Sequence, residues 1–266
     1  MHWRFTTAGF KCAPAHGGRV VTPDFTIITC TRNSVATLPQ TLQSLQQQRG
    51  VSFEQVFVDG DSTDATLDLL RAVPGQTTLL TGVRGGIARA MNTGIAAAQG
   101  EIVAHLHSDD YYLHPDVLAT VKQRMDHDGS DWLFGRIVSD VDGRQVPESF
   151  VVPPIDRARL LRRNLVPHPA TFVRRAVFQR FGGFNEDYRL AMDYEFWLRI
   201  QPHLKLSQLS EPLTAFRVHP DSATHKFAWS SFNEDFRARF SHAPVRYWPE
   251  FMLRYAVRAG RQWAGV

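Results

Sequence analysis

Acidic side chains directly follow two apolar, strand-like segments of this 266-residue chain. Asp59 ends the first segment and opens the turn 59–64, which also contains Asp61 and Asp64. A carboxylate at the end of a strand can accept hydrogen bonds from a nucleobase N–H or from a ribose hydroxyl. Asp, Gly and Ser also build ordinary turns between a strand and a helix, so the turn alone leaves both interpretations open.

The second group of acids is Asp109 and Asp110, which follow the apolar segment 101–106. Adjacent carboxylates are costly to bury unless they bind a cation or accept hydrogen bonds. Mg²⁺ and Mn²⁺ take carboxylate oxygens together with substrate phosphates, and such a metal can act as a Lewis acid on a departing diphosphate. The sequence therefore predicts a divalent metal site, with a solvated turn before Tyr111 as the alternative.

Asp193 lies among aromatic and aliphatic side chains in the segment 190–199. An acid in such surroundings is expected to have a raised pKa, which suits a general base that removes a hydroxyl proton. The alternative is that Asp193 caps a helix that begins at Tyr194. Glu195 and Arg199 stand four residues apart and are expected to pair on that helix.

Histidines and arginines in loop-like segments complete the candidate site residues. His168, His219 and His225 could donate to a diphosphate or ligate the metal, or could be ordinary surface residues. Arg84 precedes Gly85 and Gly86 at the start of a predicted helix, and both Arg84 and Arg89 could face an anionic donor. Glycines before a helix can cradle phosphate, but a simple turn is the alternative.

The elements that must position these residues alternate between strands and helices. Apolar, β-branched runs predict strands over 25–30, 54–59, 77–80 and 101–106. Helices are predicted to begin at a capping box of Thr37 and Gln40, at Ser62 as an N-cap, and near residue 86. Such alternation implies a parallel, doubly wound sheet, whose ligands bind at the carboxyl ends of the strands.

The rest of the chain is less regular. Strands are predicted over 131–138 and 213–218, a turn between strands at 141–144, and helices over 157–164, 175–181 and 193–200. The composite prediction is an irregular leader (1–23), a domain (24–225) with a nucleotide-binding half (24–110) and an acceptor half (111–225), and a basic helical extension (226–266).

The C-terminal extension combines arginines with aromatic residues. At helical spacing, one face of 248–263 carries Trp248, Phe251, Met252, Tyr255, Ala259 and Trp263. This composition is typical of an interfacial membrane helix, and equally of a helix that docks on the core of its own protein.

Composition excludes several classes of protein. Hydrophobic residues make up 43% and charged residues 21% of the chain, which indicates a globular protein. The net charge of +4 is dispersed and does not indicate nucleic-acid binding. The only cysteines are Cys12 and Cys30, and no segment approaches the ~20 apolar residues of a membrane span. We expect a cytoplasmic protein, with peripheral contact at the inner face of the cytoplasmic membrane left open.

Over residues 25–225 the order of these motifs resembles the family 2 glycosyltransferases. The segments that carry the resemblance are 25–33, 58–66, 86–102, Ser108-Asp109-Asp110, 182–186 and 193–199. The resemblance implies a GT-A fold, which is α/β with a Rossmann-like, mainly parallel sheet, a smaller mixed acceptor-side region and a helical C-terminus. It also implies inverting transfer of a sugar from a nucleotide-diphosphate donor, with a UDP-sugar expected.

The resemblance also assigns roles to residues. Asp193 would be the catalytic base, and Asp110, with His219 as a further candidate, would hold Mn²⁺ or Mg²⁺. The nucleotide would contact Thr31, Asn33, Asp59, Asp61, Arg84 and Asp109. The acceptor would be a saccharide or lipid-linked saccharide of cell-surface polysaccharide synthesis.

The sequence departs from the family pattern at four positions. Asp61 stands in the nucleotide turn where glycine or aspartate is usual, and Ala65 stands there in place of a common glycine. Arg89 stands where an acid is frequent, and Met192 precedes Asp193 where an acid is frequent. Two alternatives stay open: a nucleotidyltransferase that acts on sugar phosphates, and a non-catalytic protein that binds a nucleotide sugar.

Overall fold

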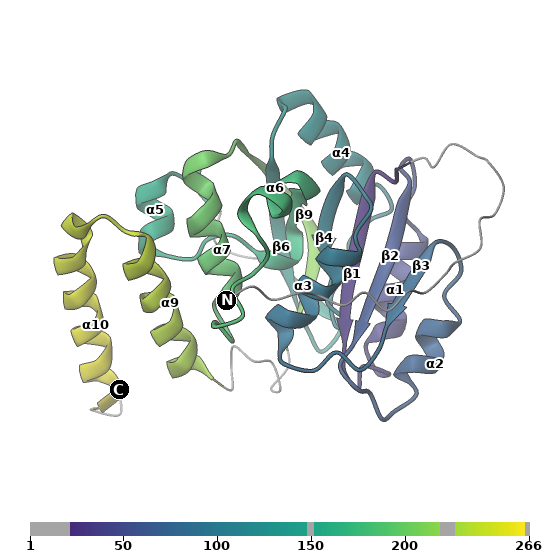
Figure 1. Cartoon of the computed structure of the whole chain (residues 1–266), viewed down its shortest axis with the longest axis horizontal. Helices are drawn as coiled ribbons and strands as arrows, with labels where there is room; N and C mark the ends of the chain where they lie inside the picture. Colours follow the sequence, from purple (N-terminus) through teal and green to yellow (C-terminus); the bar gives the residue numbers. More distant parts are fainter. Residues whose placement is uncertain (1–21, 148–151, 219–226, 264–266) are drawn as a thin grey trace, which may run out of the picture.

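The computed structural model describes residues 22–147, 152–218 and 227–263. Within these ranges, strands and helices build one mixed nine-stranded sheet with helices on both faces and two helices at the C-terminus (Figure 1). The strands are β1 (Phe25–Thr31), β2 (Phe53–Asp59), β3 (Thr77–Leu80), β4 (Ile102–His105), β5 (Tyr111–Tyr112), β6 (Trp132–Val141), β7 (Arg144–Pro147), β8 (Thr171–Arg174) and β9 (Leu206–Val218).

The sheet has the order β3-β2-β1-β4-β8-β6-β9-β5, with β7 paired to β6. The first four strands along the chain are parallel to one another, as the alternation of strands and helices predicts. The strand β8 is antiparallel to both β4 and β6, and β9 then runs parallel to β6. The carboxyl ends of β1 to β4 therefore lie at one edge of the sheet, and the acidic turns follow there.

The helices are α1 (Leu38–Gln46), α2 (Thr66–Arg71), α3 (Ile87–Ala97), α4 (Val117–Asp128), α5 (Arg157–Arg162), α6 (Arg175–Phe181), α7 (Met192–Ile200), α9 (Ala228–His242) and α10 (Trp248–Trp263). Short 3₁₀ turns cover His168–Ala170, Gln201–His203 and Val245–Tyr247. The predicted strands and helices of the first 110 residues are confirmed, whereas α4, β8 and most of β9 had no counterpart in the sequence-based prediction.

Two hydrophobic clusters fill the two faces of the sheet. Phe25 and Ile27 of β1 pack on the side of α1 and α4, while Ile28 and Cys30 pack on the side of α3 and α7. Both faces of β1 are buried, which explains why its sequence is a continuous apolar run instead of an alternating one. On the second face, Trp132 and Trp197 stack with their ring centroids 5.3 Å apart.

Gly100 allows the chain to pass β1 at close range. A Cβ atom at this position would lie 2.4 Å from the backbone C of Phe25 and the backbone N of Thr26. Gly100 lies three residues after the end of α3 at Ala97, just before β4. Only glycine fits, because the obstacle is backbone that belongs to the central strand.

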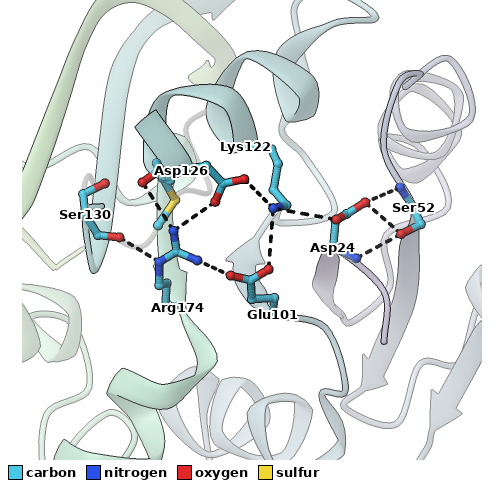
Figure 2. A network of polar contacts seen from close by, with 8 residues as sticks. Asp24, Ser52, Glu101, Lys122, Asp126, Ser130 and Arg174 are labelled. Carbon is cyan, nitrogen blue, oxygen red and sulfur yellow. Dashed lines mark hydrogen bonds and ion pairs between the residues drawn. The ribbon is translucent and has the colours of Figure 1, made fainter. Parts of the chain in front are cut away.

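A network of charged side chains ties together the opposite edge of the sheet, where β1, β2 and β4 begin. Figure 2 shows Lys122 of α4 among the carboxylates of Asp24, Glu101 and Asp126, at 3.9, 3.6 and 2.6 Å. Arg174, at the end of β8, pairs with Glu101 and with Asp126, the latter at 3.1 Å, and also donates to the Ser130 carbonyl. This edge is held by ion pairs and is remote from the acidic turns.

Two helix starts differ from the predicted pattern. Thr37 is the N-cap of α1, as predicted, but its side chain makes no cap hydrogen bond, and the Gln40 side chain accepts from Arg217 of β9 instead of completing a capping box. Ser62 does not begin a helix, since α2 starts at Thr66, and its hydroxyl instead donates to Asp59. A contact with a distant strand replaces the capping box at Gln40, whereas a contact three residues away engages Ser62.

The C-terminal helix packs on its own protein through part of its surface. Phe251 is fully buried against Phe240 of α9, and the Tyr255 hydroxyl donates to Asn233. Glu250 pairs with Arg162 of α5 at 3.0 Å. Figure 1 shows α9 and α10 side by side at the end of the molecule away from β3. No helix in the described part of the chain is long and apolar enough to cross a membrane.

Candidate active site

A pocket of about 680 Å³ opens at the carboxyl ends of β1 and β2, at the place where doubly wound sheets bind ligands. Its lining includes Thr31 at the end of β1, Asp61 in the turn after β2, and Arg84 before α3. Three of the six predicted nucleotide-binding residues therefore meet at one cavity. Gly85 and Gly86 also line it at the start of α3, so the unpaired N–H groups of that helix favour an anion there.

Asp59 is fully buried beside this pocket. Its carboxylate accepts from the Thr31 hydroxyl at 2.8 Å, from the Ser62 backbone N–H at 2.9 Å and from the Ser62 hydroxyl at 2.6 Å. Asn33 joins the same turn, because its side-chain oxygen accepts from the Thr63 N–H at 2.8 Å. Asp59 and Asn33 thus fix the shape of the pocket wall.

Asp61 and Arg84 form an ion pair at the pocket rim. Asp61 has a φ of +64°, a left-handed conformation that favours glycine and that aspartate adopts more readily than most other residues. The Arg84 side chain is 83% exposed, so it can turn toward a bound anion. Arg89 is exposed and lies over Gly85, where a Cβ atom would meet its Cδ at 2.7 Å.

Asp110 is buried at the turn after β4. Its Oδ1 accepts from the backbone N–H of Arg217 at 3.1 Å, and its carbonyl accepts from the Thr41 hydroxyl at 2.8 Å. Burial, and then the neighbouring Asp109, raise the pKa of Asp110 well above its ordinary value. This carboxyl is held in place where its ionised form would benefit from a nearby cation.

The carboxylate oxygens at this turn suit a hard divalent cation whose remaining ligands are supplied by water and substrate phosphates. No group of three or more His, Cys, Asp or Glu side chains gathers as a metal site within the residues described. Mg²⁺ and Mn²⁺ commonly take one or two carboxylates, with water and substrate phosphates as the other ligands. The strand β9 ends at Val218, close to this turn, and the candidate ligand His219 lies outside the described residues, as does His225.

Three histidines stack between this turn and α7. The His168 ring lies 5.4 Å from those of His105 and His107, and 6.0 Å from Trp197. Burial is the main cause that lowers the pKa of His168 well below its ordinary value and that of His105 to about 3. His168 is therefore a neutral, packed ring that joins the acidic turn to α7, instead of a surface loop residue.

Asp193 lies in the first turn of α7, half-buried, four residues before Trp197 and on the same side of the helix. Its Oδ1 accepts from the Tyr194 N–H at 2.7 Å. Burial raises its pKa to about 6, the negative charge of Asp235 adds to this effect, and hydrogen bonds from Tyr194 and the Asn164 side chain oppose it. The alternative that Asp193 is the N-cap is wrong, because that position belongs to Ala191.

The neighbouring pair of charges behaves as the sequence predicts. Arg199 Nη2 lies 2.9 Å from Glu195 Oε2, and the Glu195 carboxylate also contacts His242 of α9 at 2.9 Å. Arg199 further donates to the carbonyls of Phe181 and Gly183. These contacts dock α7 against its surroundings, and within the described residues no cationic side chain pairs with Asp193.

Sequence reasoning missed two residues that touch the candidate catalytic acids. Arg217 donates from its backbone to Asp110 and from its side chain to the Asp109 carbonyl, across more than 100 residues. Asn164 follows α5 and donates to Asp193, with its own Oδ1 accepting from Val166 N. No local sequence signal links either residue to its partner.

Known proteins resemble this chain in sequence and in fold. Residues 26–228 match the family model "Glycosyl transferase family 2". A Mycobacterium bovis protein named "PGL/p-HBAD biosynthesis glycosyltransferase" is 34% identical over 182 residues, which cover 66% of this chain and 69% of that protein. An uncharacterized glycosyltransferase of Mycobacterium tuberculosis is 33% identical over 184 residues, covering 66% of this chain and 68% of that protein.

Solved structures also resemble this chain in fold. TarS 1–349 of S. aureus, in complex with UDP, superposes with a TM-score of 0.65 at 26% identity and covers 81% of this chain. The matched region spans only 64% of that TarS chain. The mannosyltransferase PcManGT from Pyrobaculum calidifontis, in complex with GDP-Man and Mn²⁺, has a TM-score of 0.65 at 21% identity. The match covers 92% of this chain and 72% of the PcManGT chain. At this identity the similarity establishes the fold and nothing further. The fold and the match over 26–228 agree: this chain belongs to glycosyl transferase family 2 and has the GT-A fold.

Proposed function

We propose that this protein is an inverting hexosyltransferase that moves a sugar from a nucleotide-diphosphate donor, with UDP-sugar expected, to a hydroxyl of a saccharide or lipid-linked acceptor. One observation carries the proposal: two sets of acids lie on opposite sides of the same stack of histidines. The half-buried Asp193, whose pKa is raised, belongs to the helix whose Trp197 packs on His168, and the half-buried Asp109 and the buried Asp110 follow His107 on the other side. The UDP complex of TarS supports UDP as the first nucleotide to test.

The pocket of about 680 Å³ is the proposed donor site. Thr31, Asn33 and Asp59 would form the wall against the base and ribose, with Asp59 held by the turn around Ser62. Arg84, released in part from Asp61, would approach a donor phosphate, and Asp109 would contact ribose or water. Asp110, with His219 as the further candidate, would hold Mn²⁺ or Mg²⁺, which supplies positive charge that stabilises the departing nucleoside diphosphate.

Asp193 is the proposed base. Its carboxylate takes the proton of the acceptor hydroxyl while that oxygen forms a bond to the anomeric carbon, on the face opposite to the breaking bond to the diphosphate. A pKa of about 6 leaves most of the carboxyl ionised near neutral pH and makes it a stronger base than an exposed aspartate. The nucleoside diphosphate leaves with the bonding electrons, and no covalent enzyme intermediate forms.

The outer face of α10 supports a peripheral contact with the membrane that would present a lipid-linked acceptor. This outer face consists of Trp248, Met252, Leu253 and Val257, whose exposed fractions are 42, 59, 68 and 49%. Arg254 and Arg258 border it and are exposed. Exposed apolar side chains beside arginines are the pattern of a helix that lies on an anionic lipid surface. The proposed location is therefore the inner face of the cytoplasmic membrane.

Vesicle flotation tests the membrane contact. The wild type is expected to float with phosphatidylcholine vesicles that contain phosphatidylglycerol, and less at high salt. The double variant Met252→Ser/Leu253→Ser should bind at least about tenfold more weakly, because each lost apolar side chain contributes on the order of 1–3 kcal/mol to insertion. The matched control is Val146→Ser, an apolar residue of β7 that is 42% exposed. Equal flotation of all three proteins would refute the contact.

Titration calorimetry with UDP, with and without Mn²⁺, tests the donor site. We expect Mn²⁺ to strengthen UDP binding to the wild type and to have little effect on Asp110→Asn, whose fold is checked by its melting temperature. If Mn²⁺ strengthens UDP binding to Asp110→Asn as much as to the wild type, Asp110 is refuted as a metal ligand. Hydrolysis of a UDP-sugar then separates a transferase from a non-catalytic binding protein, and release of pyrophosphate from UTP with a sugar phosphate would instead indicate a nucleotidyltransferase.

A further inference from the structure

A second pocket, of about 220 Å³, lies on the acceptor side of the molecule and has two arginines in its wall. Arg136 of β6 and Arg163 after α5 contribute the guanidinium groups, and Asn164 lies next to them. The other lining residues, Ile137, Val152 and 165–167, are apolar, and none of the described residues that line the pocket carries a carboxylate. We call this cavity the arginine pocket.

Irregular pairing of β6 with β9 brings Arg136 into the pocket wall. The register between these strands shifts on both sides of Arg136, so that Arg136 and its neighbour Ile137 line the same cavity although they are adjacent in one strand. Gly135 permits the irregularity, because a Cβ atom there would lie 2.4 Å from Leu213 Cδ1 of β9. The fold thus directs a cation to this place.

Asn164 connects the arginine pocket to the proposed base. It lines the pocket, its Oδ1 accepts from the Val166 N–H at 3.3 Å, and its side chain also donates to the Asp193 carboxyl. A group bound in the pocket therefore lies one side chain away from Asp193. The residues of the pocket are different from those of the larger nucleotide pocket, so the two are separate cavities.

From this arrangement we propose that the arginine pocket binds an anionic group, a phosphate or a carboxylate, on the acceptor, close to the hydroxyl that Asp193 deprotonates. The inference rests on the proposed transferase function and adds to it the chemical class of the acceptor. Guanidinium groups bind both kinds of anion through paired N–H donors. Arg136 and Arg163 also interact within the protein, but five N–H donors on each leave capacity for an anion.

The size of the cavity and the absence of carboxylates among the described lining residues support an anion rather than a whole neutral sugar chain. Pockets for complete small-molecule ligands usually measure about 300–1,000 Å³, so 220 Å³ fits one charged group and the atoms that attach it. Two arginines in one wall offer several N–H donors and positive charge, which favour an anion over a neutral group.

Binding of three probes with the same carbon skeleton tests the proposal: glycerol phosphate, glycerate and neutral glycerol. Each is titrated by ligand-observed NMR into protein saturated with UDP and Mg²⁺, so that the donor site is filled. We expect glycerol phosphate or glycerate, but not glycerol, to bind at millimolar concentration. The preferred probe identifies a phosphate or a carboxylate as the natural group.

Substitutions locate the bound probe. Arg163→Gln and Arg136→Gln should each weaken its binding at least tenfold, while Arg163→Lys keeps part of it and the exposed control Arg180→Gln leaves it unchanged. If Arg136→Gln fails to fold, the exposed Arg163 carries the test. UDP binding is measured on the wild type and on every variant. If the wild type does not bind UDP, the result counts against the donor site and not against the arginine pocket.

Three outcomes would overturn the inference while leaving the donor site intact. Glycerol binding as tightly as the charged probes would exclude anion recognition. Unchanged binding in both arginine variants would place the anion elsewhere. Binding of the probe to the UDP-free protein alone, with loss of that binding when UDP is added, would make the arginine pocket part of the donor site.

Discussion

Replacement of Asp193 by asparagine tests the proposed chemistry most directly. Asparagine keeps the shape of the side chain and can still accept from the Tyr194 N–H, but it cannot take a proton. General base catalysis usually contributes about 10²- to 10⁴-fold to a rate, so Asp193→Asn should lower the rate of sugar transfer by that factor, or about 3–5 kcal/mol in activation free energy. Binding of UDP should be unchanged.

The pH dependence of the transfer rate gives a more precise test of Asp193 than the loss of rate in the variant. Burial raises the pKa of Asp193 from 3.8 to about 6, and the proton must be absent for the carboxyl to act as a base. At pH 5 only about 9% of the carboxyl would be ionised, against about 94% for an aspartate with the ordinary pKa. The rate should therefore rise about tenfold between pH 5 and 7 and then level off.

The rise of the rate between pH 5 and 7 is the acidic limb of the pH–rate profile. Two neighbouring substitutions should move this acidic limb in opposite directions. The charge of Asp235 raises the pKa of Asp193, so Asp235→Asn should shift the limb to lower pH. The hydrogen bond from Asn164 lowers the same pKa, so Asn164→Leu should shift the limb to higher pH. A change of the limb in Asp235→Asn without a change in UDP binding would separate titration of Asp193 from damage to the donor site.

The assay is release of UDP from a UDP-sugar, to an acceptor or to water, followed between pH 4.5 and 8 with the melting temperature measured at each pH. A group whose pKa is raised on folding stabilises the fold in its protonated form, and this contribution is lost as the pH rises through about 6. Asp193→Asn should therefore be at least as stable as the wild type at pH 8. Full activity of a folded Asp193→Asn protein, or a wild-type rate that is flat from pH 5 to 7, would refute the assignment of the base.

Two further predictions concern the framework that holds the site. Gly100→Ala should destabilise the protein by about 1–3 kcal/mol in urea unfolding, because the new Cβ would lie 2.4 Å from the backbone of β1; an unchanged midpoint would show that β1 can move away. Arg174→Met should lower the free energy of unfolding by about 1–3 kcal/mol, because it removes the donor to the Ser130 carbonyl and leaves Glu101 and Asp126 with Lys122 alone as their cationic partner in the network, and high salt should reduce the difference. The exposed Arg71→Met is the control for Arg174, since the ion pair of Arg71 with Asp68 lies at the surface and is expected to contribute under about 1 kcal/mol.

Local sequence was sufficient for the sheet and for one edge of the site. The apolar runs of β1, β2 and β4 and the helices between them obey short-range rules of periodicity and connection, which place their carboxyl ends at a common edge. Thr31, Asp61 and Arg84 meet at the donor pocket for that reason. The resemblance over 25–225 then suggested a family that the match over 26–228 confirms.

The second half of the chain was harder, because its strands pair across long intervals. The pairing of β8 between β4 and β6 and the long β9 join segments that no local pattern relates. The capping box at Thr37 does not form for the same reason, because Gln40 accepts from Arg217 of β9; Ser62 fails as a cap for a local reason, because its hydroxyl bonds to Asp59. The helix α10 packs part of its surface on α9, which is one of its two predicted alternatives, and contact with a membrane stays a prediction.

What the sequence by itself determined was the kind of chemistry: carboxylates at strand ends and an acid within an apolar helix, whose types and order follow from the chain alone. What only the tertiary structure decided was how each acid is tuned and what stands beside it. Burial sets the pKa of Asp193, the backbone N–H of Arg217 holds Asp110 from 107 residues away, and a strand irregularity puts Arg136 in the pocket that Asn164 shares. Electrostatic effects depend on distance and on the exclusion of water in three dimensions, and neither can be read along a chain.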